Sequence, residues 1–125
     1  MDVTPTLAAG ALPVHGYGEG FFRVGEAVIQ GPIFLRPQQV QAAPVATLDA
    51  LTAEHITAIC QSEPIPQVLL LGVGKSFDKL PAKELRLAAK AAGVILEPMD
   101  TGAACRTWNV LLSEGRRVSA LMWPV

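Results

Sequence analysis

Two short segments place small and polar residues directly after an expected strand, where a ligand could approach the backbone. The first reads LGVGKS at positions 71–76. Gly72 and Gly74 would let backbone N–H groups reach an anion, and Lys75 would add a positive charge. A phosphate-binding loop needs a glycine where this chain has Leu69, and a dinucleotide fingerprint needs a third glycine and an immediate helix. A tight turn that requires two small residues is therefore the simpler interpretation.

The second segment, MDTGAACRTWN at positions 99–109, leaves an expected strand and enters a helix. The unpaired N–H groups of a helix start attract anions. Asp100 or Thr101 can cap this start, although the carboxylate of Asp100 would repel a bound anion. The small residues that follow would let a ligand or another backbone come close, so we treat Asp100 and Thr101 as candidate binding residues.

Cys105, Arg106 and Asn109 complete this candidate set on the same helix. A helix N-terminus lowers a cysteine pKa, so Cys105 is a candidate nucleophile, and Arg106 is a candidate anion clamp. The alternative is that Cys105 is a small buried hydrophobic residue. We favour that alternative because no histidine is tied to Cys105 by spacing, and we therefore assign no catalytic residue.

The run HGYGEGFFR at positions 15–23 is rich in glycine and precedes an expected strand. It could form the flexible lip of a binding site. We favour an irregular stretch that Tyr17 and Phe21 anchor to the core.

Composition excludes several classes of function. The chain has 125 residues, of which half are hydrophobic, and its ten basic and eleven acidic residues leave a net charge of −1, which argues against nucleic-acid binding. The longest apolar run, at positions 68–71, is too short to cross a membrane. The two histidines and two cysteines lack metal-ligand spacing, so we expect neither metal nor cofactor.

Cysteine content and the first ten residues bear on location. Two cysteines are few for a small secreted domain, which favours the reducing cytoplasm. Residues 1–10 lack a basic start and a continuous apolar stretch, so we expect neither a signal nor a transit peptide.

The first half of the chain predicts antiparallel strands. Residues 21–24 and 27–29 form an expected hairpin with its turn at Gly25. The strand resumes at residues 33–35 after Pro32, which should make it an edge strand or a bulge. Residues 36–44 should be a polar connection.

The second half alternates helices and strands. Thr52 should cap a first helix, with Leu51 packing on Ile56. The other expected elements are a strand at 68–71, a helix with Pro81 in its first turn and Gly93 past its end, a strand at 94–96 stopped by Pro98, a helix from Asp100 to Glu114, and a strand at 118–121. This order predicts a single three-layer α/β/α domain over residues 14–125, with a mixed central sheet that includes the hairpin, about three helices, and a loosely held lead-in at 1–13.

Three segments together resemble a known family. They are residues 16–24, residues 69–74, and residues 99–109 with the EGRRV run at 114–118. In this order they resemble the uncharacterised-domain family that includes mitochondrial complex I assembly factor 3 and its bacterial and archaeal relatives. The resemblance runs from about residue 14 onward, and with no transit peptide expected the chain resembles the bacterial relatives. Val73 and Trp108 replace the threonine and tyrosine expected there, which argues against catalysis at those positions.

The resemblance implies a three-layer α/β domain with a mixed sheet, no settled catalytic activity, and a role in assembling a respiratory or membrane complex beside a protein partner. The first hypothesis is therefore a non-enzymatic assembly or interaction protein. The second is a small-ligand or anion site, which could be enzymatic, where the Gly72–Gly74 turn meets the helix start at Asp100. It requires these two loops to be neighbours at the carboxyl ends of parallel strands.

Overall fold

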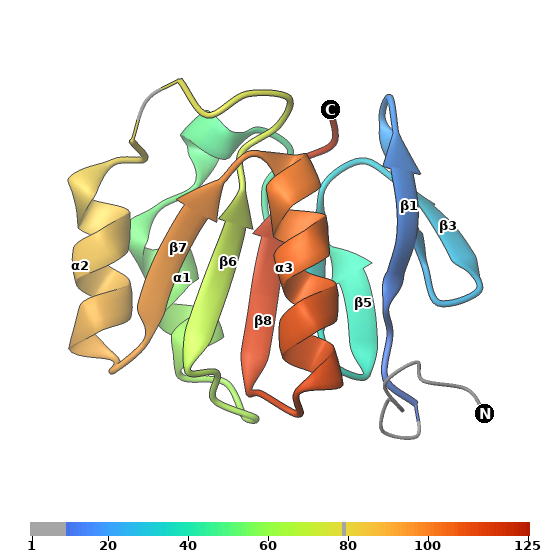
Figure 1. Cartoon of the computed structure of the whole chain (residues 1–125). Helices are drawn as coiled ribbons and strands as arrows, with labels where there is room; N and C mark the ends of the chain where they lie inside the picture. Colours follow the sequence, from blue (N-terminus) through green and yellow to red (C-terminus); the bar gives the residue numbers. More distant parts are fainter. Residues whose placement is uncertain (1–9, 79) are drawn as a thin grey trace.

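The computed structural model describes residues 10–78 and 80–125 (Figure 1). Residues 1–9 of the predicted lead-in lie outside this part of the chain. The elements within it are β1 (Val14–Gly18), β2 (Phe21–Val24), β3 (Ala27–Gln30), β4 (Ile33–Arg36), β5 (Gln39–Ala42), a 3-10 turn η1 (Leu48–Ala50), α1 (Ala53–Cys60), β6 (Val68–Gly72), α2 (Lys83–Ala91), β7 (Ile95–Met99), α3 (Thr101–Ser113) and β8 (Val118–Met122).

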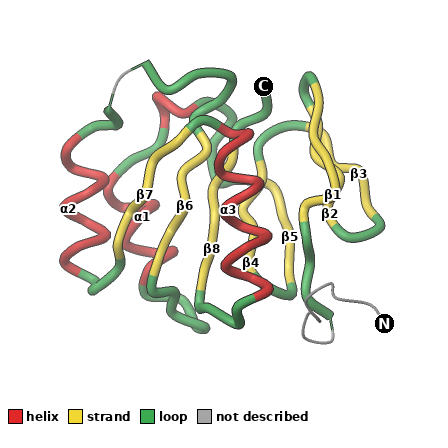
Figure 2. Tube along the Cα trace, viewed as in Figure 1, coloured by secondary structure: helices red, strands yellow, loops and turns green. Residues whose placement is uncertain are grey.

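The central sheet has five strands in the order β5-β4-β8-β6-β7 (Figure 2). β6 pairs in parallel with β7 on one side and β8 on the other, whereas β4 pairs antiparallel with β5 and β8. Because β6, β7 and β8 run the same way, their carboxyl ends meet at one edge of the molecule. The predicted three-layer architecture with a mixed central sheet is confirmed.

The predicted hairpin exists as β2 and β3, but it lies outside the central sheet. It forms a separate antiparallel sheet with β1, in the order β1-β2-β3. Gly31 adopts a φ of +80°, which only glycine reaches easily, and turns the chain out of this sheet. The antiparallel strands of the central sheet are β4 and β5, so the prediction that the hairpin makes the central sheet mixed was wrong.

Two stretches expected to be irregular are strands. β1 and β2 together cover most of the glycine-rich run, and β5 lies within the expected polar connection at 36–44. In β1, a Cβ on Gly18 would lie 2.4 Å from the Phe21 ring, so this glycine makes room for an aromatic side chain rather than for a flexible loop. β5 was not predicted from the sequence because three of its four residues are exposed and two of them are glutamines, so the segment resembles a polar loop.

Proline positions account for the other corrections. Pro32 precedes β4, so that strand loses no ladder donor and lies between β5 and β8 instead of at an edge. Pro98 does not stop β7, which runs to Met99. β7 is an edge strand, and the backbone N–H of Ile95 donates towards the β6 side. Because successive backbone nitrogens of a strand point to alternate sides, the nitrogen of Pro98 points away from β6, where no hydrogen bond is needed. Pro81 lies two residues before α2 rather than in its first turn.

The helices begin and end where local sequence requires. Thr52 caps α1 through a reciprocal pair of hydrogen bonds with His55, and Leu51 and Ile56 are buried in one cluster as predicted. The side chain of Asp100 caps α3 by accepting from the Ala103 N–H at 2.9 Å. Gly115 ends α3 with a φ of +70°.

Helices cover both faces of the central sheet (Figure 1). On one face, α1 and α2 bury aliphatic side chains against alternate residues of β6, such as Leu69 and Leu71. On the other face, Leu70 packs in a second cluster together with α3 and the small sheet, including Phe22 and Trp108. The β6 strand is thus buried on both faces, as its continuous apolar run indicated.

Candidate functional site

The Gly72–Gly74 turn and the start of α3 are neighbours at the carboxyl edge of the central sheet. The Thr101 N–H donates to the Gly74 carbonyl at 2.8 Å, and the Gly74 N–H donates to Thr101 Oγ1 at 2.9 Å. This meets the geometric condition that the small-ligand hypothesis set. The same bonds also show that both backbone donors are already satisfied inside the protein.

Thr101 ties three elements together beneath the surface. Its side chain is fully buried, and its hydroxyl donates to the Trp123 carbonyl at 2.6 Å while accepting from Gly74. A Cβ on Gly72 would lie 3.1 Å from Thr101 Oγ1 and 3.2 Å from Met122, so a side chain at the end of β6 would press against the start of α3 and against β8. Gly72 and Thr101 are therefore buried residues that hold the loop after β6 against the start of α3, and they do not face solvent.

A cleft of about 500 Å³ lies above this junction. Its lining residues come from the end of β1, the β1–β2 turn, the loop after β6, the start of α3 and the last residue: Tyr17, Glu19, Lys75, Asp100, Gly102, Arg106 and Val125. Three of the residues expected from sequence, Lys75, Asp100 and Arg106, therefore share one surface. Sequence reasoning did not assign Tyr17 and Glu19 to the site, although their glycine-rich run was considered as a binding lip.

The cleft carries balanced charge. Lys75 and Arg106 are cationic, Glu19 and Asp100 are anionic, and none of the four makes an ion pair within 4.0 Å in the described part of the chain. Asp100 uses one oxygen as the cap of α3. These side chains are consequently available to charged groups of a binding partner.

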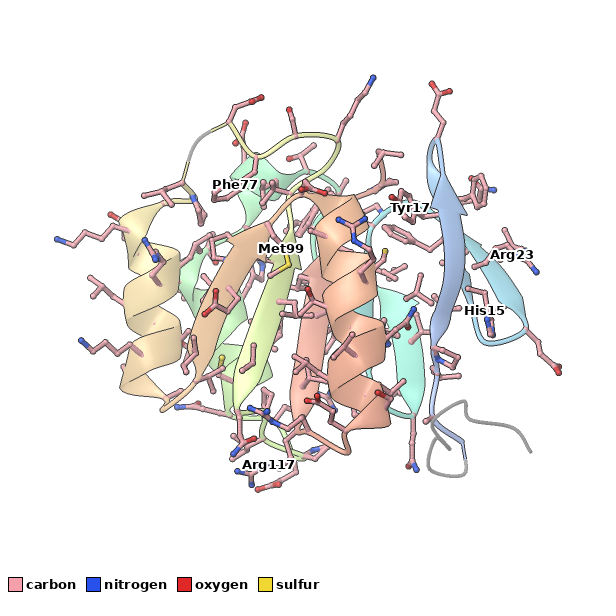
Figure 3. All side chains as sticks on the ribbon, in the orientation of Figure 1. His15, Tyr17, Arg23, Phe77, Met99 and Arg117 are labelled. Carbon is pink, nitrogen blue, oxygen red and sulfur yellow. The ribbon has the colours of Figure 1, made fainter. Side chains whose placement is uncertain are left out.

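Tyr17 lines the cleft from the end of β1, and Figure 3 shows this residue between β1 and the start of α3. A Cβ at position 102 would lie 2.5 Å from the Tyr17 hydroxyl oxygen, so Gly102 is what allows this ring to approach the helix. The side chain of Tyr17 keeps 40% of its surface exposed. It offers an aromatic face and a hydroxyl beside the four charged groups.

Cys105 faces the core and not the cleft. Its thiol is 3.8 Å from Met122 Sδ, and 4% of the residue is exposed. Burial raises the pKa of the Cys105 thiol to about 12, and the positive charge of Arg106 offsets only part of that rise. A thiolate nucleophile needs the opposite shift, so this environment suits the buried hydrophobic role favoured above.

Asn109 lies farther along α3 and holds β1. Its side-chain amide donates to the Val14 carbonyl and accepts from the Val14 N–H, each at 2.8 Å. These are the two bonds that a neighbouring strand would make, so Asn109 completes the edge of the small sheet. Trp108 adds a bond from its indole nitrogen to the Leu12 carbonyl at 2.9 Å.

Within residues 10–78 and 80–125, no three His, Cys, Asp or Glu side chains gather to hold a metal ion. In the same ranges, no helix combines the length and the apolar character that crossing a membrane requires.

Comparison with known proteins finds relatives along almost the whole chain. A family model described as "Protein of unknown function (DUF498/DUF598)" matches residues 14–123. An uncharacterized protein of Rhodobacter capsulatus is 43% identical over 117 residues, which cover 94% of this chain and 88% of that protein. NADH dehydrogenase (ubiquinone) 1 alpha subcomplex assembly factor 3 of Bos taurus is 31% identical over 91% of this chain. The chain spans 61% of the length of that bovine protein.

Solved structures show the same fold. A crystal structure of a Bordetella parapertussis protein matches with a TM-score of 0.81 and 34% identity, covering 94% of this chain and 99% of that one. A solution structure of a Bordetella pertussis protein, described as an Mth938-like domain, matches with a TM-score of 0.77 and 29% identity, covering 99% and 92%.

Proposed function

Since this chain belongs to the DUF498/DUF598 family of proteins of unknown function, which the sequence resemblance predicted, we propose that it is a partner-binding protein that assists the assembly of a respiratory complex. The observation that carries the proposal is the similarity to the bovine NADH dehydrogenase assembly factor over 91% of this chain. The matched region includes the fold and the elements that build the cleft. The proposal places the protein in the cytoplasm, where its two free cysteines would stay reduced.

The internal bonding of the site favours binding over catalysis. The N–H groups of Gly74 and Thr101, which an oxyanion or phosphate would need, donate to atoms of the protein itself. The thiol that could act as a nucleophile is buried against Met122. The cleft presents four charged side chains to solvent around Tyr17, and such an arrangement suits the recognition of another protein surface.

We assign the cleft as the surface that contacts the partner. Arg106 and Lys75 would pair with carboxylates of the partner, and Arg106 can do so through two parallel hydrogen bonds. Glu19 and Asp100 would exclude partners whose acidic groups lie in the wrong places. Exposed tyrosine beside arginine is a combination that dominates the energy of many protein interfaces.

Affinity capture of the tagged protein from its native host, with mild detergent and mass spectrometry, tests this function. We expect subunits of an NADH dehydrogenase or a related membrane complex to be enriched. Arg106→Glu should remove the enrichment, whereas Arg23→Glu, on the exposed face of β2, should keep it. Capture of no selective partner, or capture that Arg106→Glu leaves intact, contradicts the proposal.

One observation favours a second candidate, a small zwitterionic ligand. The cleft presents two cations and two carboxylates within one hollow of about 500 Å³. Such a ligand would raise the melting temperature of the purified protein without any partner. A screen of amino acids and related zwitterions, repeated on Arg106→Glu, separates this candidate from the assembly role.

A further inference from the structure

A second hollow lies at the opposite end of the central sheet. It is lined near the start of β8 by Val118 and Leu112, which are almost fully buried, and by Pro37, Pro64 and Pro66. Figure 3 shows Arg117 at this end and Tyr17 and Met99 at the other. The hollow therefore shares no residue with the cleft described above.

Apart from Gln38 and two arginines, the residues that line this hollow are apolar, and its cavity is about 220 Å³. At the volume that water occupies in the liquid, this space corresponds to roughly seven molecules. Aliphatic and proline walls offer such waters few of the polar partners that they need. An aliphatic body of similar size would instead be stabilised there by burial of its surface.

The charged residues that line the hollow are both arginines, Arg116 and Arg117. Arg116 makes one long contact with Glu114, at 3.7 Å, and the side chains of both partners are half exposed, so the pair is weak. The side chain of Arg117 makes no hydrogen bond or ion pair with any described residue. Its backbone is held, because its carbonyl accepts from the Gln67 N–H at 2.8 Å.

The neighbouring polar hollow does not compete for an anionic group. It shares Pro37 and Pro64 with the first one and is lined by Arg36. The guanidinium of Arg36 already donates to the Glu63 carbonyl at 3.1 Å and to Ser62 Oγ at 2.8 Å. An anionic head group is thereby directed to Arg116 and Arg117.

We propose that this hollow binds a small aliphatic carboxylate, with its chain between Leu112 and the prolines and its carboxylate on Arg116 and Arg117. Arginine recognises a carboxylate through charge-assisted, bidentate hydrogen bonds. The proposal does not depend on the assembly function, because the two surfaces lie at opposite ends of the parallel strands.

Titration of the isotopically labelled protein with sodium octanoate, followed by NMR shift changes, tests the proposal. We expect saturable binding with a dissociation constant on the order of 1 mM or below, and shifts centred on Gly115 and Val118. Octanol and octylammonium, which keep the chain but lack the carboxylate, should bind at least about tenfold more weakly.

Matched variants locate the head group. Replacing both arginines, Arg116→Gln with Arg117→Gln, should weaken octanoate binding about tenfold or more, whereas Arg23→Gln should change it by less than about twofold. These arginines are exposed, so the double variant should fold. Ala11→Phe, which fills the hollow from its rim, should also abolish binding.

Three results would overturn the proposal: no saturation by octanoate up to about 5 mM, equal binding of octanol, or shifts spread over both ends of the molecule. If octanoate fails to bind and an acidic peptide binds here instead, the hollow belongs to a protein partner.

Discussion

On the side of α3 that faces the two sheets, Thr101, Cys105 and Asn109 are each held by contacts inside the protein. On the side that borders the cleft, Arg106 makes no ion pair with a described residue, and Asp100 uses only one of its oxygens. Both sets were candidates for binding because they share one short helix. The difference shows that spacing along a helix selects residues near a site, while burial decides which of them can meet a partner.

The largest effect should come from Thr101→Val, which keeps the shape of the side chain but removes its hydroxyl. The Gly74 N–H and the Trp123 carbonyl would each lose a buried partner, so we expect a loss of ~2–4 kcal/mol in the free energy of unfolding. Urea denaturation measures it. Thr101→Ser keeps the hydroxyl and should lose clearly less free energy of unfolding. Equal losses for the two variants would contradict the distinction between the covered face of α3 and the cleft.

Asn109→Ala should have the next largest effect. Both hydrogen bonds to Val14 would be lost, with an expected cost of ~1–3 kcal/mol and faster hydrogen exchange at the Val14 amide. The fold that remains should still present the cleft and bind the partner. If Asn109→Ala removes partner binding from fully folded protein while Val14 stays protected, then Asn109 belongs with the contact residues.

Cys105 should make stability depend on alkaline pH. Its pKa is raised in the folded protein to about 12 from an ordinary value of 9.0, so the unfolded chain loses the proton first. The contribution of the buried thiol is therefore complete below pH 9.0 and is lost as the pH rises towards about 12. Cys105→Ala should show a smaller fall in urea midpoint above pH 9.0 than the parent. Both proteins should carry Cys60→Ala, because burial also raises the pKa of Cys60.

Gly102→Ala should have a small effect on stability and a clear effect on the cleft. The new methyl group would displace the Tyr17 hydroxyl, from which its ideal position is 2.5 Å away. Alanine also favours the helix by up to ~1 kcal/mol, which should offset much of the strain. We expect a melting temperature near that of the parent and weaker partner capture. Unchanged capture would remove Tyr17 from the contact surface.

The sequence predicted the features that depend on residues close together in the chain, such as helix caps and helix ends. The cap at Thr52 and the end of α3 at Gly115 follow from interactions within a few residues, and both are confirmed. Of the two residues expected to cap the start of α3, Asp100 is the cap, and Thr101 is the first residue of the helix. β5 was missed because its alternation of glutamines with Val40 and Ala42 spans only four residues, three of which are exposed. Its pairing with β4 depends on how the whole sheet assembles.

The cleft required information that no local pattern contains. Tyr17 and Arg106 are far apart in the sequence, and they line one surface because β1 packs against α3, through apolar contacts as well as through Asn109. The inward direction of Cys105 likewise follows from the sheet on which α3 packs. Sequence could identify the helix that carries the site, but it could not show which of its faces would be covered.

We propose that the cleft, and not the covered face of α3, meets a protein partner. A photo-crosslinking amino acid placed at Lys75, in the cleft, and separately at Arg23, on β2, tests this in intact cells of the native host. We expect the variant at position 75 to crosslink to a subunit of a respiratory complex and the variant at position 23 to give no such product. Crosslinks of equal yield from both positions, or none from position 75 while the protein is folded and present, would contradict the account.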